Sequence, residues 1–515
     1  MPAATFAAAD GVVAAVIDDV EAVVALHDVG HRHPSARRVN DPKGLLAGLG
    51  WQTGLVSEPA RNRCRPWELT EGDVASAVGR IRARDAALAD EVEHVIGSLT
   101  WGEGPGVISQ SGLQEWLWYV VPTKYLTDEV GYMGRLAETA AVLFDELGLD
   151  GYGAICRSDD TAKVHEAFDR SDAAGRSALR KAIERSGVDA PDLDDFAWSS
   201  VMRSEEASAR SAVDAALEDG IYTGEMTVGA KGWREVQKRV CTRVLDGDHP
   251  QMPGQSWRTA VVTERIESWV SVAERRSPTL LEPRAQIANR LLHPVEPPPE
   301  AGTAVRPLVW LLERWGDEQP LTQAGYLKPA FVQSLQVDRP WTDPFDRPVK
   351  NELDDHVLHD LRGWLQRAGA VRKHKASLRR TPLGRNIAAD PEEAWRALTR
   401  HLVVGDEWER FVGESALLFL LGQDEPVSDN AASVFIRECA LEMGWQTTSD
   451  GITEPPSLRD VSWTFADARH VWDTCALTDT FRDWGNRQIS LSDTGRAAAL
   501  SHLRHVAAGP KDSPW

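Results

Sequence analysis

Cysteine is scarce in this chain of 515 residues: the five cysteines are Cys64, Cys156, Cys241, Cys439 and Cys475, and no two form a CxxC pair. An odd and scattered set excludes a disulfide framework and a zinc site built from cysteine pairs. It is typical of thiols that stay reduced, so we expect a cytoplasmic protein.

Long apolar runs are also missing. The most apolar stretch, residues 113–126, is too short to span a membrane and contains Pro122 and Lys124. Residues 1–24 have no basic segment and carry three aspartates, which does not match a secretory signal peptide. We therefore expect no membrane among the partners.

Positive charge is limited. Lys and Arg number 57 against 78 Asp and Glu, which gives a formal net charge of −21. Because phosphate binding requires clustered cations, this balance excludes a surface that binds nucleic acid throughout. Any site for a polyanion has to be local.

Signatures of common enzymes are missing as well. There is no G-x-S-x-G motif, and the glycines of residues 102–112 have no lysine that would complete a phosphate-binding loop. Acidic pairs such as Asp159–Asp160 fall at predicted helix starts, where they favour the helix dipole. These absences favour a non-enzymatic protein, and we expect no cofactor.

What the sequence does contain is helical periodicity. Before residue 293, apolar residues recur at helical spacing in six segments: 70–99, 128–148, 160–187, 193–220, 232–245 and 256–276. Thr70 and Asp73 match a capping box, and Gly148 is a natural C-cap. We predict one helical region over residues 1–155 and a second over residues 156–292.

An aromatic segment inside the first region has two interpretations. Residues 113–125 contain Trp116, Trp118, Tyr119 and Tyr125. A buried core helix kinked at the proline is the favoured interpretation, and the wall of a ligand or partner groove is the other.

A proline-rich segment, "HPVEPPPEAGTAVRP" (293–307), has five prolines and no apolar periodicity. We predict that it is a linker between the helical N-terminal part and the rest of the chain.

An internal repeat follows this segment. "GDEQPLT" (316–322) is matched by "GQDEPVS" (422–428), and "LRRTPLGR" (378–385) by "ISLSDTGR" (489–496). Both copies have the order helix, helix, helix, hairpin, Gly-Arg turn and last helix. Three helices followed by a two-stranded wing predict two tandem winged-helix-like modules, over 308–402 and 405–508. The fold class expected is mainly α, with small β-hairpin wings.

The C-terminal half also resembles a known group. The stretches "LTQAGYLKPAFVQSL" and "LDDHVLHDLRGWLQRAGAVRKHKASLRRTPLGRNIAADPEEAWRAL" are similar to uncharacterised actinobacterial proteins with helical tails, some of which accompany plasmid-type ORF-3-like domains. The resemblance covers about residues 300–510. It implies tandem winged-helix-like modules and no established activity.

The first predicted wing is strongly basic. Its candidate contacts for DNA or for an acidic protein surface are Arg372, Lys373, Lys375, Arg379 and Arg380. Alternation in a strand predicts basic side chains on both faces of this hairpin. In the second copy the basic run is absent and only the Gly-Arg turn recurs. Gly384 and Arg385 are therefore expected to be architectural, and the basic run to carry a specific contact.

The helix before this wing argues against DNA reading. Four carboxylates are expected to be exposed on or before it, and they would repel phosphates: Glu352, Asp354, Asp355 and Asp360. The leading hypothesis is therefore a recognition or regulatory protein that acts through the winged modules on DNA or on a protein. A protein-interaction scaffold that binds no nucleic acid is the alternative.

One string has an enzyme-like composition. "ALHDVGHRHP" (25–34) resembles the metal-binding dipeptide of HD-domain phosphohydrolases at His27 and Asp28, and His31 and His33 are further candidate ligands. That family needs another histidine on an earlier helix, and none precedes His27. A metal-dependent phosphohydrolase is thus the second alternative, and a helix end followed by a polar loop explains the string equally well.

Overall fold

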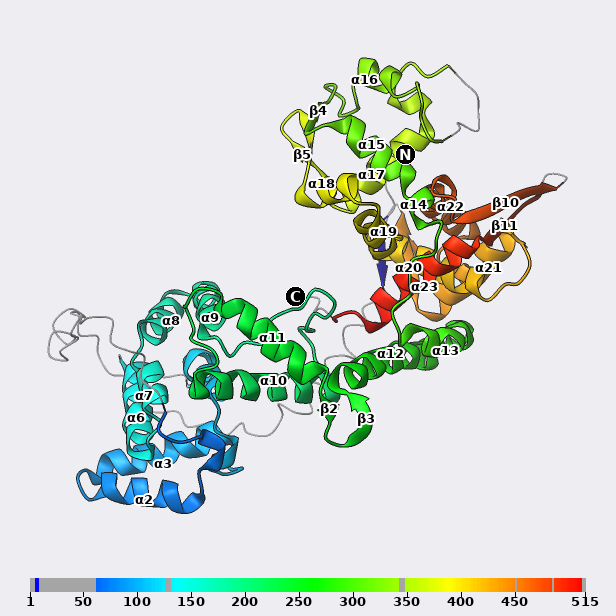
Figure 1. Cartoon of the computed structure of the whole chain (residues 1–515). Coiled ribbons are helices and arrows are strands. Elements are labelled where there is room, and N and C mark those ends of the chain that lie inside the picture. Colours follow the sequence, from blue (N-terminus) through cyan, green and yellow to red (C-terminus); the bar gives the residue numbers. More distant parts are fainter. Residues whose placement is uncertain are drawn as a thin grey trace. The chain divides into compact units, whose positions relative to one another are not determined.

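The structure is a computed structural model that describes residues 62–125, 131–341, 348–449, 452–483 and 486–511, together with the backbone of residues 5–8. The chain divides into two compact units, which Figure 1 colours along the sequence. Unit 1 comprises Met1–Gly30 and Val262–Gly509, and unit 2 comprises His31–Val261 and Pro510–Trp515. Both are mainly helical, with small antiparallel sheets.

Among its described residues, the elements of unit 2 are helices and one short hairpin. The helices are α2 (Glu71–Arg82), α3 (Ala86–Thr100), α4 (Gln110–Glu115), a π-helix (Trp116–Val120), α5 (Val121–Lys124), α6 (Tyr132–Leu147), α7 (Asp150–Cys156), α8 (Asp159–Arg170), α9 (Asp172–Ser186), α10 (Ser204–Thr223) and α11 (Trp233–Leu245). Two 3-10 turns lie at Pro66–Glu68 and Pro105–Val107, and the hairpin joins β2 (Asp248–His249) to β3 (Met252–Ser256). Helix α12 (Trp257–Arg276) contains the boundary between the units.

Local capping explains several helix ends. The capping box of Thr70 and Asp73 is present at the start of α2, and Gly148 ends α6 with a left-handed φ of 78°. Two predicted helices are each divided in two, because Asp85 caps a new helix α3 and Ser171 caps a new helix α9. The helix predicted over 193–220 begins only at Ser204.

Unit 2 has two hydrophobic clusters. The first extends from Ala77 to Ala182 and includes Trp116 and Trp118, so the aromatic segment is a core helix before Pro122, as favoured from the sequence. The second extends from Ala190 to Val261. The clusters change between 182 and 190, whereas the predicted division at 155/156 falls within α7.

Unit 1 contains the repeated part of the sequence. Its elements are β1 (Thr5–Ala8), α13 (Pro278–Leu291), α14 (Ala301–Ala304), α15 (Arg306–Trp315), β4 (Glu318–Pro320), α16 (Pro329–Ser334), a 3-10 turn (Glu352–Asp354), α17 (His356–Arg367), β5 (Val371–His374), β6 (Ser377–Arg380), α18 (Pro382–Ala389), α19 (Pro391–Arg400), α20 (Glu407–Leu421), β7 (Val427–Ser428), α21 (Asp429–Glu442), β8 (Trp445–Ser449), β9 (Ile452–Glu454), α22 (Leu458–Thr474), β10 (Thr478–Asp483), β11 (Asn486–Leu491) and α23 (Asp493–Ala508). Helix α13 buries Leu280, Ile287 and Leu291 in the core of this unit. The proline-rich segment 293–307 therefore lies within unit 1, and the units divide earlier, at Val261–Val262.

The same chain path occurs twice in unit 1. In the first copy α15, β4, α16, α17, β5 and β6 follow one another, and the sheet order is β4-β6-β5. In the second copy α20, β7, α21, α22, β10 and β11 follow one another, and the sheet order is β10-β11-β7. In both, the short strand after the first helix pairs antiparallel with the second strand of the hairpin. The second copy adds β8 and β9, which form a three-stranded sheet with β1.

The repeated Gly-Arg turn has a steric cause. Thr381 accepts a hydrogen bond from the amide of Gly384 (3.2 Å), and its own amide donates to the carbonyl of Ala370 (3.0 Å). A Cβ on Gly384 would lie less than 3.0 Å from that same carbonyl oxygen. A Cβ on Gly495 in the second copy would likewise lie less than 3.0 Å from the carbonyl oxygen of Leu477. The glycine is therefore required by close backbone approach, and its expected architectural role is confirmed.

Two global features agree with the composition. The five cysteines are free thiols, and all except Cys64 are buried. Among the residues that the structure describes, no helix has the length and apolarity that crossing a bilayer requires.

Candidate functional site: the first hairpin

The basic segment folds into the hairpin of β5 and β6, where Val371 pairs with Arg380 and His374 with Ser377. Val371 and Leu378 are buried and hold the hairpin on the core. Lys375, at the turn, has a φ of 54°, a left-handed conformation that costs a residue with a side chain about 1–2 kcal/mol. The hairpin is thus anchored at its base and presents a strained lysine at its tip.

Two of the five candidate residues have internal partners. Arg379 Nε lies 2.8 Å from Glu318 Oε2, and Arg380 Nη2 lies 3.2 Å from Asp317 Oδ1. Arg380 also donates to the carbonyl of Leu312 (3.3 Å). Hydrogen bonds from Ser377 and then Arg379 hold the pKa of Glu318 below its usual value. These two arginines therefore bind the hairpin to β4 and α15 instead of facing a partner.

The other three candidates are exposed cations, with Arg372 and Lys373 on β5 and Lys375 at the turn. Arg372, Lys373 and Lys375 are exposed, and none of the ion pairs between described residues involves them. We call these three residues the cationic tip. It contributes three positive charges on one hairpin of an acidic chain.

The helix before the hairpin differs from its prediction. Glu352 and Asp355 are both completely buried, so their expected exposure is wrong. Glu352 Oε1 lies 2.5 Å from Arg362 Nε, and Asp355 Oδ2 lies 2.9 Å from Arg339 Nη1. Both carboxylates are neutralised within the fold, because a buried charge without a partner is strongly unfavourable.

The third helices of the two copies, α17 and α22, pack against each other. His470 Nδ1 of α22 lies 2.8 Å from Asp360 Oδ2 of α17, and this carboxylate raises the pKa of His470. In α17 only His356 and Arg367 are exposed. The packing of α22 therefore occupies one side of α17.

The second hairpin has a different electrostatic role. Arg487 Nη2 on β11 lies 2.6 Å from Asp473 Oδ2, and the buried Arg469 of α22 lies 2.5 Å from Asp429. Phe481 on β10 is half exposed. These two arginines are balanced by carboxylates of the same copy.

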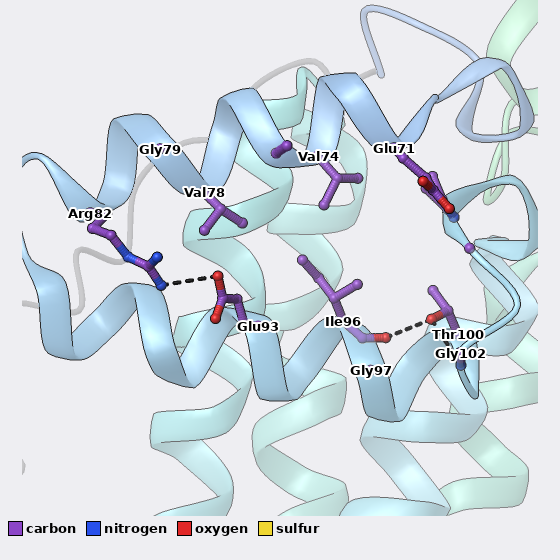
Figure 2. Close-up of a pocket in the computed structure, with 13 residues that line it drawn as sticks. Glu71, Val74, Val78, Gly79, Arg82, Glu93, Ile96, Gly97, Thr100 and Gly102 are labelled. Carbon is purple, nitrogen blue, oxygen red and sulfur yellow. Dashed lines mark hydrogen bonds and ion pairs between the residues drawn. The ribbon is translucent and has the colours of Figure 1, made fainter.

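Unit 2 contains an apolar groove between α2 and α3, with a volume of about 560 Å³. Figure 2 shows Val74 and Val78 facing Ile96 across it, with the ion pair of Arg82 and Glu93 (2.9 Å) at one end. It holds no cluster of nucleophilic or titratable side chains that points to a reaction.

A second hollow in unit 2 was missed by the sequence analysis. It is lined by Gln114, Asp189, Arg210 and Asp214, among others, and has a volume of about 330 Å³. Only the spacing of Arg210 and Asp214, four residues apart on α10, is visible in the sequence as a signal. Tyr119 of the aromatic segment also lines this hollow, in partial agreement with the groove interpretation.

The metal candidates His27, Asp28, His31 and His33 lie outside the described residues. Within the described part of the chain, no group of three or more His, Cys, Asp or Glu is arranged to hold a metal ion.

Comparison of the chain with protein family models, with curated proteins and with solved structures finds no match.

Proposed function

We propose that residues 308–402 and 405–508 form two tandem winged-helix-like modules of a non-enzymatic recognition protein. The order of elements supports this, because a winged helix combines three helices with a hairpin and a short strand that closes its sheet. Both copies have that order and that sheet connection. We further propose that the cationic tip is the contact with the partner.

The contact proposal rests on which of the five basic residues have ion-pair partners and which do not. Arg379 and Arg380 are engaged by carboxylates of the same module. Arg372, Lys373 and Lys375 are exposed and take part in none of the ion pairs between described residues. The left-handed φ of Lys375 is the one that a two-residue hairpin loop requires, so it belongs to the turn.

An acidic protein surface fits the tip better than duplex DNA does. Winged helices read DNA through the third helix in the major groove, and α22 packs against one side of α17. Three cations alone give a weak, salt-dependent phosphate contact. A complementary acidic protein surface requires only the hairpin, because electrostatic complementarity gives specificity and fast association without groove insertion.

The test compares two triple variants of the full chain. One carries Arg372→Ala, Lys373→Ala and Lys375→Ala. The control carries the same charge change at three other exposed cations of the module, Lys328→Ala, Lys350→Ala and Arg400→Ala. Binding is measured by fluorescence anisotropy with two labelled probes, a 12-residue Asp/Glu-rich peptide and a 20-base-pair DNA duplex, at low and at physiological salt.

We expect the peptide to bind the wild type and the control, and to lose at least tenfold in affinity with the tip variant. Equal peptide binding by both variants would overturn the tip as the contact. In the third outcome, the duplex binds more tightly than the peptide at physiological salt and loses that binding in the tip variant. That result would support the cationic tip as the contact, but it would make DNA the partner and overturn the acidic protein surface.

A further inference from the structure

The hollow introduced above lies where three helices of unit 2 converge. We name it the Asp214 pocket, and it is lined by Gln114 of α4, Tyr119 of the π-helix, Ile183 and Ser186 of α9, and Arg210 and Asp214 of α10, with Asp189 in the loop after α9. Its volume of about 330 Å³ is at the lower end of the range for small-molecule sites. π-helical turns are rare and often occur at functional sites.

One wall of the pocket has more carboxyl groups than cations. Arg210 Nε lies 3.2 Å from Asp214 Oδ1, and a second nitrogen of the same guanidinium contacts Asp189. The Arg210 guanidinium also lies 5.4 Å from the centre of the Trp198 ring. A single arginine is therefore shared between two carboxylates, and Glu115 at the exposed rim adds a third.

Two polar side chains of the pocket lack partners. Gln114 as a residue is 5% exposed, and its side chain makes no hydrogen bond with the described residues, although its amide is not among the fully buried unpartnered atoms. The hydroxyl oxygen of Ser186 is buried and also has no hydrogen-bond partner there. Leaving a buried hydroxyl unpaired costs about 1–3 kcal/mol, so a ligand that reaches Ser186 and the Gln114 amide would satisfy both groups.

The opposite wall is apolar. Leu179 and Ile183 of α9 and Val188 of the following loop line it. A ligand that fills the pocket therefore needs a short apolar body in addition to its polar groups.

We propose that the Asp214 pocket binds a small organic cation, a primary ammonium or guanidinium on a short apolar body, with the cation at Asp214 and Asp189. The cation balances the charge that Arg210 leaves uncompensated. The body packs on Leu179, Ile183 and Val188. This site is separate from the proposed recognition function of unit 1 and stands independently of it.

The pKa of Asp214 determines how the affinity for a cation should depend on pH. Burial raises the pKa of Asp214 to about 7, and Arg210 opposes this rise only in part. The charged or titratable groups around it are Arg210 on α10, Asp189 in the loop, Glu115 and Tyr119 on the α4 side, and Cys241 on α11. A bound cation favours the ionised carboxylate, so its affinity rises with pH.

The size of this effect follows from the pKa. With a value of about 7, the ionised fraction of Asp214 rises about tenfold between pH 6 and pH 8. An alkylamine stays protonated throughout this range, because amines of the lysine type titrate near pH 10. The affinity for an amine should therefore rise about tenfold over the same interval.

The experiment is isothermal titration calorimetry of the full chain with phenethylamine and agmatine as probes. 2-Phenylethanol and phenylacetate serve as the neutral and the anionic counterpart of phenethylamine. We expect at least one of the two amines to bind with an affinity that rises about tenfold from pH 6 to pH 8, and the alcohol and the acid not to bind. No binding of either amine at millimolar concentration, or equal binding of the alcohol, would overturn the proposal.

Variants locate the site. Asp214→Asn should lower the amine affinity at least tenfold at pH 8 and remove its pH dependence. The control, Asp172→Asn, removes an exposed carboxylate that pairs with Arg176 four residues away, and it should leave binding unchanged. Ile183→Phe fills the apolar wall and keeps the charges, so it should abolish binding even if the Asp214 variant does not fold. Unchanged binding in Ile183→Phe contradicts the location.

Discussion

Replacing Gly384 with alanine tests the steric origin of the repeated Gly-Arg turn. The new methyl group would meet the carbonyl oxygen of Ala370 at less than 3.0 Å. That oxygen already accepts hydrogen bonds from the amide and the hydroxyl of Thr381. Since the obstacle is backbone and not the end of a flexible side chain, α18 has to move away from the start of β5.

The cost can be worked out from what this movement disturbs. The bond from the Thr381 amide to Ala370 contributes about 0.5–1.5 kcal/mol, and the Thr381 cap about 1 kcal/mol. Partial loss of the packing of the buried Ile387 adds about 1–2 kcal/mol. Alanine loses less backbone entropy on folding than glycine does, which offsets about 1 kcal/mol of this cost. The expected net destabilisation is about 2–3 kcal/mol.

A second glycine provides the control. Gly363, inside α17, would place a Cβ no closer than 4.0 Å to any atom, the nearest being the end of the Arg367 side chain. Gly363→Ala should therefore stabilise by about 0.5–1 kcal/mol. Because a chain of two units need not unfold in one step, urea unfolding is combined with hydrogen exchange of the peptides that cover residues 370–389. Equal urea midpoints and equal exchange for the two variants would refute the steric argument.

Three further predictions follow from other contacts. Ala476 has a left-handed φ of 51° at the position where the first copy has Gly369. Ala476→Gly should therefore stabilise unit 1 by about 0.5–1 kcal/mol, and Gly369→Ala should destabilise it by a similar amount. Urea unfolding measures both changes. Glu352→Gln leaves the buried charge of Arg362 uncompensated and should destabilise by about 3–5 kcal/mol; an unchanged melting temperature would show that the ion pair is not formed. The raised pKa of Asp214 stabilises the fold at low pH, and this stability is lost as the pH rises from the unfolded value of 3.8 through about 7. The free energy of unfolding should therefore fall less between pH 5 and pH 8 in Asp214→Asn than in the wild type, by about 2–3 kcal/mol. Parallel pH profiles of unfolding for the two proteins would contradict the assigned pKa.

Local signals were readable from the sequence. The capping box of Thr70 and Asp73, the C-cap at Gly148 and the recurring Gly-Arg turn each depend on residues a few positions apart, and the structure contains all three. Helix breaks at Asp85 and Ser171 were missed because the apolar periodicity continues across them. A single capping residue was enough to start a new helix.

Long-range pairing could not be read in the same way. Arg379 pairs with Glu318, 61 residues away, and no local pattern distinguishes it from the unpaired cations of the tip. Glu352 and Asp355 have the composition of an exposed acidic helix start, yet both are buried against arginines. The Asp214 pocket is assembled from segments about a hundred residues apart, since Gln114 and Asp214 meet only through the packing of three helices.

The tryptophans of the two third helices have a consequence for how the repeat can be divided. Trp364 donates its indole N–H to the carbonyl of His401 (2.8 Å), and Trp472 donates to that of Leu402 (3.0 Å). One copy thus supplies two consecutive acceptors, one for each copy. A fragment that begins at Gly405 would leave the buried indole of Trp472 without its acceptor, whereas a fragment that ends at Leu402 keeps the acceptor of Trp364. The second copy therefore depends on the first for one buried hydrogen bond, and the dependence runs in one direction.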